Sequence, residues 1–577
     1  MGQVFRQLAP YLWRYRRGLL LGIGALIIKD ILGVLLPLTM RSGVDSLTRG
    51  FRIEQVFEFA GVLVLLSLGK GLFQYWMRVI LIGMSRDIEY DLRNDLFANL
   101  VTLSSNFYSK YRTGDIMARA TNDLNAVRMM LGPGIMYWME TTLTAVLSIA
   151  VMLGVDWRLT LMALIPAPAV SLVVIVFGRK IHDRFEKIQA MFSDISSRVQ
   201  ENLSGVRVIR AYAQETAELR TFEVLNRDYV AHNIKLARLS GLFNPLLQAL
   251  ISLTFLLVLW VGGYQLLEHR ISLGSFVMFN TYMGMLVWPM IAMGWVVNLM
   301  QRGSASWSRI SQLMHERPAI TGGERGAEPA RGEIIFENVG VSYPAGDALR
   351  DVRLRIRAGT TVAIVGHTGS GKTTLVNLIP RLLDPSRGRI LLDGANLGEL
   401  DPEWVRQQIG FVPQETFLFS ATLGENIAWG VKHATQTEIE RAAELAGLAP
   451  DIAGFPAGYD TVVGERGITL SGGQKQRTAI ARAILRNPRI LILDDALSSV
   501  DTLTEERILT GLEEVMRGRT TILISHRVST VRGADRIFVL EQGEIAEEGT
   551  HEELVASGGY YADLYQKQLL EEELEAI

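Results

Sequence analysis

Residues 362–373 have the sequence VAIVGHTGSGKT, and this stretch decides the fold of the C-terminal half of the chain. Its first four residues form an apolar run that predicts a buried strand, and the following eight fit the pattern GxxxxGK[ST]. In such a loop, glycines let the backbone approach a phosphate closely, and the next helix adds the positive charge of its N-terminus. The stretch therefore predicts a phosphate-binding loop between a strand and a helix.

Individual residues of this loop have expected roles. Lys372 would hold the β- and γ-phosphates of ATP, and the hydroxyl of Thr373 would bind Mg²⁺. ATP and Mg²⁺ are therefore the predicted cofactors. The loop residues expected to contact ATP are Gly366, His367, Thr368, Gly369, Ser370, Gly371, Lys372, Thr373 and Thr374.

A second apolar run, residues 490–493, ends in Asp494. Central parallel strands are continuous apolar runs, and ligands gather at their carboxyl ends. Asp494 is therefore placed to hold Mg²⁺ through water. The run alone is a weak signal, but together with the phosphate-binding loop it predicts a nucleotide site.

The N-terminal half contains six apolar stretches, each near the ~20 residues that a helix needs to cross a bilayer. Arg and Lys concentrate before the first stretch and in the long second and fourth connections. By the positive-inside rule these segments, and with them both termini, are expected in the cytoplasm. The expected spans are residues 18–40, 56–84, 133–155, 159–178, 245–267 and 273–300.

These patterns define the expected domains. Residues 1–316 are expected to form the transmembrane domain, residues 317–332 a linker rich in Gly, Pro and charge, and residues 333–577 the nucleotide-binding domain. The predicted fold class is a membrane α-helical bundle of six transmembrane helices with long cytoplasmic extensions, fused to an α/β P-loop ATPase domain.

Several ionisable residues lie inside the expected spans, where charge is costly. They either line a transport pathway or pair helices and snorkel to the interface, and the sequence leaves both interpretations open. Two of them are adjacent, and neighbours on a helix do not face one another, so their mutual neutralisation is not assumed. The residues are Lys29, Asp30, Lys70, Arg78 and Glu140.

Composition excludes several classes of site and partner. The formal net charge of -2 gives no electrostatic reason to expect nucleic acid as a partner. The absence of cysteine excludes disulfides, thiolate metal sites and a cysteine nucleophile. It fits a reducing compartment and an engineered cysteine-free sequence equally well.

Residues 470–474 have the sequence LSGGQ, and with this motif the whole chain resembles an ATP-binding cassette (ABC) exporter half-transporter. The resemblance covers both the six spans and the nucleotide-binding domain. It implies that the motif begins a helix and contacts the γ-phosphate of ATP bound to an opposing cassette. The motif of this chain would thus complete the ATP site of its partner. The residues concerned are Ser471, Gly472, Gly473 and Gln474.

Further positions match the family one by one. Tyr343 looks like the aromatic residue that stacks on adenine, Gln414 like the glutamine that senses Mg²⁺, and His526 like the histidine that contacts the γ-phosphate. Gln414 is therefore expected in ATP binding, metal binding and catalysis, and His526 in catalysis. The resemblance also implies two short helices that contact the cassettes, expected near Thr113–Asn125 and Ala211–Phe222.

One position departs from the family. Where the family usually has glutamate as the general base for the attacking water, this chain has Asp495. An aspartate is one methylene shorter, and small misplacements of a general base are expensive. The chain's own site is therefore expected to turn over slowly. A chain that keeps LSGGQ and His526 but has aspartate at position 495 resembles one subunit of the bacterial heterodimeric multidrug ABC exporters. In those exporters the partner chain supplies the glutamate.

The resemblance implies ATP-driven export of amphipathic small molecules, either drug-like compounds or lipids, by alternating access across the cell (inner) membrane. The expected partners are a second half-transporter, the substrate and the lipid bilayer. A lipid or glycolipid flippase is an open alternative. A channel gated by ATP and a soluble cassette ATPase acting on DNA are further alternatives, and the six spans weigh against the latter.

Overall fold

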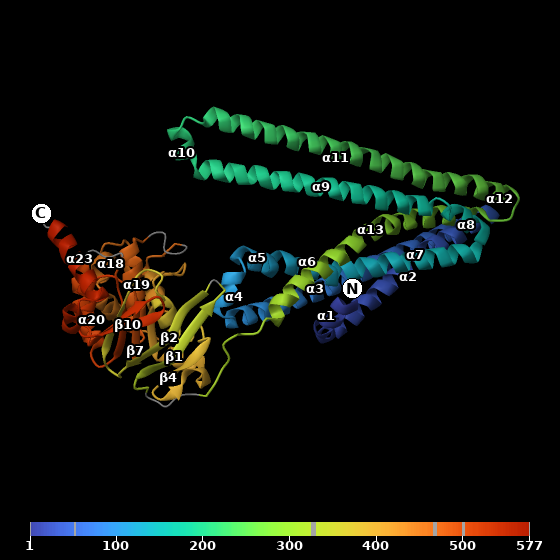
Figure 1. Ribbon diagram of the computed structural model, residues 1–577. Helices are drawn as coiled ribbons and strands as arrows, with labels where there is room; N and C mark the ends of the chain where they lie inside the picture. Colours follow the sequence, from blue (N-terminus) through green and yellow to red (C-terminus); the bar gives the residue numbers. More distant parts are fainter. Residues whose placement is uncertain are drawn as a thin grey trace. The chain divides into compact units, whose positions relative to one another are not determined.

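The computed structural model describes residues 2–50, 53–324, 330–344, 346–464, 470–498 and 502–575. The chain divides into two compact units (Figure 1). One unit comprises Met1–Val101 and Arg112–Glu316, and the other Thr102–Tyr111 and Arg317–Ile577. The expected linker, residues 317–332, lies in part outside the described residues, at 325–329.

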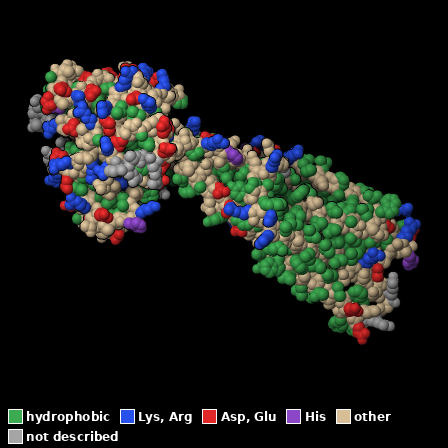
Figure 2. Space-filling model, turned by 90° about the horizontal axis from the view of Figure 1, so that it is seen from below, with side chains coloured by type: hydrophobic (Ala, Val, Ile, Leu, Met, Phe, Trp, Pro, Cys, Tyr) green, Lys and Arg blue, Asp and Glu red, His purple; other side chains and the backbone are tan. Residues whose placement is uncertain are grey.

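Six helical segments among the described residues are long and apolar enough to cross a membrane, which confirms the predicted fold class. They extend well past the apolar stretches because the long polar connections are also helical. Figure 2 shows apolar side chains covering much of one face of this unit. The segments are Arg16–Thr48, Ile53–Thr102, Thr113–Val155, Trp157–Ser204, Glu215–Leu267 and Leu273–His315.

The first unit consists of helices with a few π-helical turns. Two of its longest helices, α9 (Ala167–Ser204) and α11 (Glu215–Leu257), lie side by side and are joined at one end by α10 (Val206–Ala211) (Figure 1). The other helices are α1 (Gly2–Arg14), α2 (Arg16–Arg49), α3 (Ile53–Thr102), α5 (Thr113–Ala118), α6 (Leu124–Met129), α7 (Ile135–Val155), α8 (Trp157–Leu164), α12 (Gly263–Leu267) and α13 (Leu273–His315).

The short helices expected in the long connections lie earlier in the chain than predicted. The first is α4 (Ser105–Lys110), whereas Thr113 already begins the next long helical segment. The second is α10, which ends at Ala211, and most of the predicted range falls in α11. Residues 102–111, which include α4, group with the second unit rather than with the helices on either side of them. The predictions were displaced because neither short helix begins with a side-chain capping hydrogen bond that would mark its start.

Three ionisable side chains form one cluster between α2 and α7. The ammonium of Lys29 lies 2.7 Å from a carboxylate oxygen of Asp30 and 2.5 Å from one of Glu140. Lys29 and Asp30 are each only 4% exposed. The sequence left open whether these two neighbours pair, and the structure shows that they do, because the flexible four-carbon stem of Lys29 lets its ammonium reach the adjacent carboxylate. The hydroxyl of Thr144 adds a hydrogen bond of 3.2 Å to Asp30.

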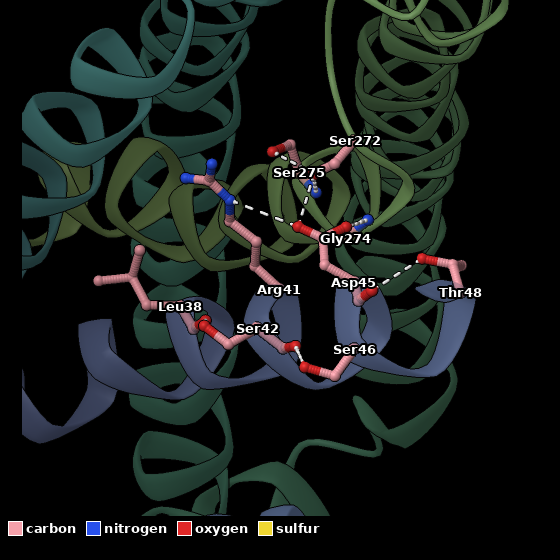
Figure 3. A network of polar contacts seen from close by, with 9 residues as sticks. All are labelled: Leu38, Arg41, Ser42, Asp45, Ser46, Thr48, Ser272, Gly274 and Ser275. Carbon is pink, nitrogen blue, oxygen red and sulfur yellow. Dashed lines mark hydrogen bonds and ion pairs between the residues drawn. The ribbon is translucent and has the colours of Figure 1, made fainter. Parts of the chain in front are cut away.

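A second polar cluster joins the end of α2 to the start of α13 (Figure 3). The carboxylate of Asp45 accepts hydrogen bonds from the Ser272 hydroxyl at 2.7 Å and from the Gly274 N–H at 2.8 Å. Ser272 is also the N-cap of α13, accepting from the N–H of Ser275. A carboxylate at a helix N-terminus satisfies free N–H groups and interacts favourably with the helix dipole. Asp45 therefore fixes these two helices to each other.

Replacing Gly274 by alanine is expected to lower the free energy of unfolding by about 1–3 kcal/mol, the range for overpacking a tight contact. A methyl group there would collide with the carbonyl oxygen of Arg41 and would lie 2.7 Å from the Asp45 carboxylate. Thermal unfolding of the purified chain in detergent measures the effect. Gly284→Ala is the matched control in the same helix, because nothing lies within 4 Å of its added methyl group. Equal midpoints for the two variants would contradict the predicted close packing.

The second unit contains two sheets. The smaller one is antiparallel, in the order β2-β1-β4-β5, and the larger one has the order β10-β9-β3-β8-β7-β6 with all neighbours parallel except β9 and β10. The strands are β1 (Ile334–Tyr343), β2 (Gly346–Ile356), β3 (Thr361–Val365), β4 (Arg387–Leu392), β5 (Ala395–Asn396), β6 (Ile409–Val412), β7 (Ile490–Asp494), β8 (Thr520–Ile524), β9 (Arg536–Glu541) and β10 (Glu544–Gly549).

Two apolar cores cover the two faces of the larger sheet. Along β3, Val362 and Ile364 belong to one core, and Ala363 and Val365 to the other. Burial on both faces explains why the parallel strands are continuous apolar runs. The helices of this unit are α4, α14 (Lys372–Asn377), α15 (Pro402–Gln407), α16 (Leu423–Ile427), α17 (Gln436–Leu445), α18 (Ala449–Ala453), α19 (Gly472–Leu485), α20 (Thr502–Met516), α21 (Val528–Val531), α22 (His551–Ser557) and α23 (Tyr560–Glu575).

Candidate nucleotide-binding site

A pocket of about 210 Å³ lies where parallel strands of the larger sheet end. Strands β3, β6, β7 and β8 run in the same direction, so their carboxyl ends meet at one edge. The chain segments that follow these four strands carry most of the predicted site residues. The pocket is lined by Ala348, Thr368, Gly369, Gly371, Lys372, Thr373, Thr374, Gln414, Asp494, Asp495, Ile524 and His526.

The predicted phosphate-binding loop connects β3 to α14, and its glycines are required by its backbone. Gly366, Gly369 and Gly371 have φ angles of 151°, 83° and 104°, a region that L-residues rarely adopt. A methyl group on Gly371 would lie 2.6 Å from the carbonyl oxygen of Ala348. The loop can therefore present its N–H groups toward a phosphate only because these positions lack a side chain.

Lys372 is buried within the loop that it follows. Its ammonium donates to the carbonyl oxygens of Gly366 and His367, both at 2.8 Å. An ammonium has three donors, so one remains for a phosphate oxygen. Burial lowers the pKa of Lys372, and the carboxylates of Asp495 and Asp494 oppose that shift. The two carboxylates thus favour the cationic form of the lysine, which is the form that binds phosphate.

Asp494 fits a role as a magnesium ligand. It is 1% exposed, and its Oδ2 atom has no hydrogen-bond partner among the described residues. Burial raises the pKa of Asp494, and a hydrogen bond with the Thr373 side chain partly offsets that shift. An unpaired buried carboxylate oxygen is costly, and a divalent cation would satisfy it. Thr373 and Gln414 line the same pocket, so the three predicted ligands lie around one space.

Asp495 occupies a constrained backbone position beside Asp494. Its φ angle is 51°, in the left-handed region that aspartate tolerates better than most residues. Its N–H donates to the carbonyl oxygen of Ile524 at 2.9 Å, which ties the end of β7 to the end of β8. His526 follows two residues after Ile524 and lines the same pocket. The predicted general base and the predicted γ-phosphate contact thus follow two adjacent strands whose ends this hydrogen bond connects.

Three residues of the predicted loop do not line the pocket. The carbonyl oxygen of Gly366 accepts a hydrogen bond from the Lys372 ammonium. The ring of His367 instead packs edge-on against Tyr560, with ring centres 4.5 Å apart. Ser370 is buried, and its hydroxyl has no partner among the described residues. These positions shape the loop, and direct contact of each with ATP stays a prediction.

The LSGGQ residues also lie away from this pocket. Ser471 is the N-cap of α19, accepting from the Gln474 N–H at 3.3 Å, while the Gln474 side chain accepts from the Ser471 N–H at 3.0 Å. This capping box leaves Gly472 and Gly473 in the first turn of the helix. The predicted start of a helix at this motif is confirmed. Within one chain, however, the motif and the phosphate-binding loop do not form a common site.

Tyr343 is the last residue of β1 and is 38% exposed. It does not line the pocket, so its stacking on adenine stays a prediction. The pocket instead includes two residues that the sequence analysis missed, Ala348 on β2 and Ile524 at the end of β8. Ile524 could have been found from the carboxyl-end rule, since it ends an apolar strand directly before Ser525 and His526. Ala348 carries no recognisable signal.

Comparison with known proteins gives consistent matches over both units. Residues 19–290 match the family described as ABC transporter transmembrane region, and residues 349–498 match the family described as ABC transporter. The chain is 38% identical to the multidrug resistance-like ATP-binding protein MdlA of Escherichia coli (strain K12), covering 99% of this chain and 98% of that protein.

Two further matches concern a lipid flippase and a solved structure. The chain is 36% identical to an ATP-dependent lipid A-core flippase of Syntrophus aciditrophicus (strain SB), over 93% of this chain and 90% of the flippase. It superimposes with a TM-score of 0.80 on the structure of a bacterial Atm1-family ABC exporter with ATP bound. That match has 29% identity and covers 96% of this chain and 99% of the exporter.

Proposed function

Because this chain belongs to the ABC exporter family, in which a cassette couples ATP hydrolysis to transport, we propose that it exports amphipathic small molecules as one half of a heterodimer. The observation that carries the proposal is the pocket at the carboxyl ends of β3, β6, β7 and β8. It gathers Lys372, Asp494, Asp495, Gln414 and His526 in a chain whose described residues also form six helical segments of membrane-spanning length.

Each pocket residue has a proposed role. Lys372 and the loop N–H groups bind the phosphates, while Thr373, Asp494 and Gln414 would hold Mg²⁺, which neutralises phosphate charge. His526 contacts the γ-phosphate. Asp495 faces the attacking water at a position one methylene short of the best geometry. ATP bound here is therefore held firmly and hydrolysed slowly.

Two features of the chain support the proposed partner, the first a second cassette and the second a chain different from this one. The LSGGQ motif lies outside the chain's own pocket, so its proposed ligand is the ATP of an opposing cassette. The aspartate at position 495 leaves this chain in need of a partner that carries glutamate there. The partner's site would then hydrolyse ATP with this chain's LSGGQ, and closure of the two cassettes would switch the spans from inward-facing to outward-facing. The proposed location is the cell (inner) membrane, with both termini in the cytoplasm.

A lipid or glycolipid is a second candidate substrate. The supporting observation is the 36% identity to an ATP-dependent lipid A-core flippase over most of both chains. A flippase and a drug exporter would use the same cassettes and the same alternating access, so only the transported molecule separates them.

The proposal is tested by transport. The chain is co-expressed with a candidate half-transporter that has glutamate at the position of Asp495, and inverted membrane vesicles are incubated with a cationic fluorescent dye or prepared with labelled lipid in the outer leaflet. ATP-dependent accumulation of dye against its gradient is expected, with none in a Lys372→Ala control. Translocation of lipid without dye uptake would favour the flippase. Equilibration without accumulation would indicate a channel and overturn the proposal.

A further inference from the structure

The loop that carries His526 is held by a side chain from the distant C-terminal helix. The amide of Gln568, on α23, donates from Nε2 to the carbonyl oxygen of His526 at 2.5 Å. The same amide accepts at Oε1 from the N–H of Val528 at 2.7 Å. Forty-two residues separate Gln568 from His526 in sequence, so this two-point contact exists only in the folded chain.

Val528 is the first residue of α21, so its N–H is one of the helix donors that have no partner within the helix. Gln568 satisfies that donor and fixes the peptide of His526 at once. A glutamine side chain suits this task because it offers a donor and an acceptor on one rigid amide. A glutamate could accept from Val528 but could not donate to His526.

Other contacts of the loop do not replace this one. The Ser525 hydroxyl accepts from the N–H of Arg527 at 3.0 Å, and the carboxylate of Glu505 accepts from the side chains of Arg527 and Thr530. These contacts hold the chain after His526. Among the described residues, the carbonyl of His526 accepts a side-chain hydrogen bond from Gln568 alone.

The same helix also touches the phosphate-binding loop. Tyr560, the first residue of α23, packs its ring against His367, with centres 4.5 Å apart. Eight residues of α-helix separate Tyr560 from Gln568, a rise of about 12 Å. One rigid helix thus contacts the loop before Lys372 at one point and the loop of His526 at another.

We propose that Gln568 is a positioning residue, which sets the direction of the His526 side chain toward the γ-phosphate by fixing the His526 peptide from α23. The inference rests on the proposed role of His526 and extends it to a residue outside the pocket. Only ATP has a γ-phosphate that His526 can contact. The preference of the chain for ATP over ADP should therefore depend on Gln568, which holds the His526 loop.

The test compares the affinities of the full-length chain for ATP and ADP, measured by displacement of a fluorescent nucleotide. His526→Ala is expected to lower the preference for ATP over ADP. Gln568→Ala is expected to lower it by about 3- to 10-fold, as for the loss of one hydrogen bond. Gln568→Glu should behave in the same way, since it keeps the Val528 contact and loses the His526 contact. The double variant His526→Ala/Gln568→Ala should lose no more than His526→Ala alone.

Gln566→Ala is the matched control, because Gln566 is exposed on the same helix and should leave the preference unchanged. A thermal midpoint near that of the wild type for Gln568→Glu excludes general loss of structure as the cause. If His526→Ala lowers the preference while both Gln568 variants keep it, or if the two losses add, Gln568 does not act through His526. If His526→Ala itself has no effect, the proposed γ-phosphate contact is wrong, and the inference falls with it.

Discussion

Purified without a partner, the chain is expected to hydrolyse ATP about 10² times more slowly than in complex with a half-transporter that has glutamate at the position of Asp495. General-base assistance is typically worth about 10²–10⁴-fold, and a misplaced base loses much of it. The measurement is steady-state release of phosphate by the chain alone and by the co-purified complex, at equal concentrations of cassette.

The backbone around Asp495 explains why the shorter side chain is not compensated. A shift of the main chain toward the water would restore the reach of the carboxylate. Asp495 is held by the bond from its N–H to Ile524, and its φ angle of 51° lies in a narrow allowed region. Because the hydrogen bond and the φ angle both fix the backbone, the Asp495 carboxylate stays farther from the attacking water than a glutamate carboxylate would be.

Two variants complete this experiment. In the complex, Asp495→Glu is expected to add at most about twofold, since the partner's site already supplies turnover and one further site becomes competent. Lys372→Ala in the lone chain tests the origin of any residual activity. Full activity of the lone chain that Lys372→Ala abolishes would mean that Asp495 is a working base and that the protein is a homodimer.

The second large effect is expected from Lys29→Met, which should lower the stability of the helical unit by about 3 kcal/mol. The substitution removes the ammonium on which Asp30 and Glu140 converge, at 2.7 and 2.5 Å. Among the described residues, Asp30 would then be a buried carboxylate without a counter-charge, and one of its oxygens already lacks a hydrogen-bond partner there. Thermal unfolding in detergent, followed by light scattering and tryptophan fluorescence, measures the loss.

Matched variants separate the two interpretations of this cluster. Lys187→Met removes a charge from an exposed position of α9 and should leave the midpoint unchanged. The triple variant Lys29→Met/Asp30→Asn/Glu140→Gln removes all three charges and should recover most of the stability, since no buried charge is left unpaired. If Lys29→Met keeps the wild-type midpoint but changes which dyes are transported, the cluster lines the transport pathway and does not pair helices.

The sequence predicted local features well because their physics is local. The phosphate-binding loop depends on glycines and a lysine that are contiguous, so its place between β3 and α14 follows from residues 362–373 alone. The six spans follow from apolar length, which a bilayer requires of each helix separately. The helix start at LSGGQ follows from a capping box within four residues.

Features that depend on distant residues were decided only by the tertiary structure. The ion pair of Lys29 with Glu140, the bonds of Asp45 to α13 and the hold of Gln568 on His526 join residues 42 to 229 positions apart. No periodicity or motif marks such pairs, because each side chain alone is compatible with many partners. The positions of α4 and α10 were likewise missed, since without strong caps the ends of a helix depend on what it packs against. The sequence thus determined which functional groups this protein has, and tertiary packing decided which other side chains position them.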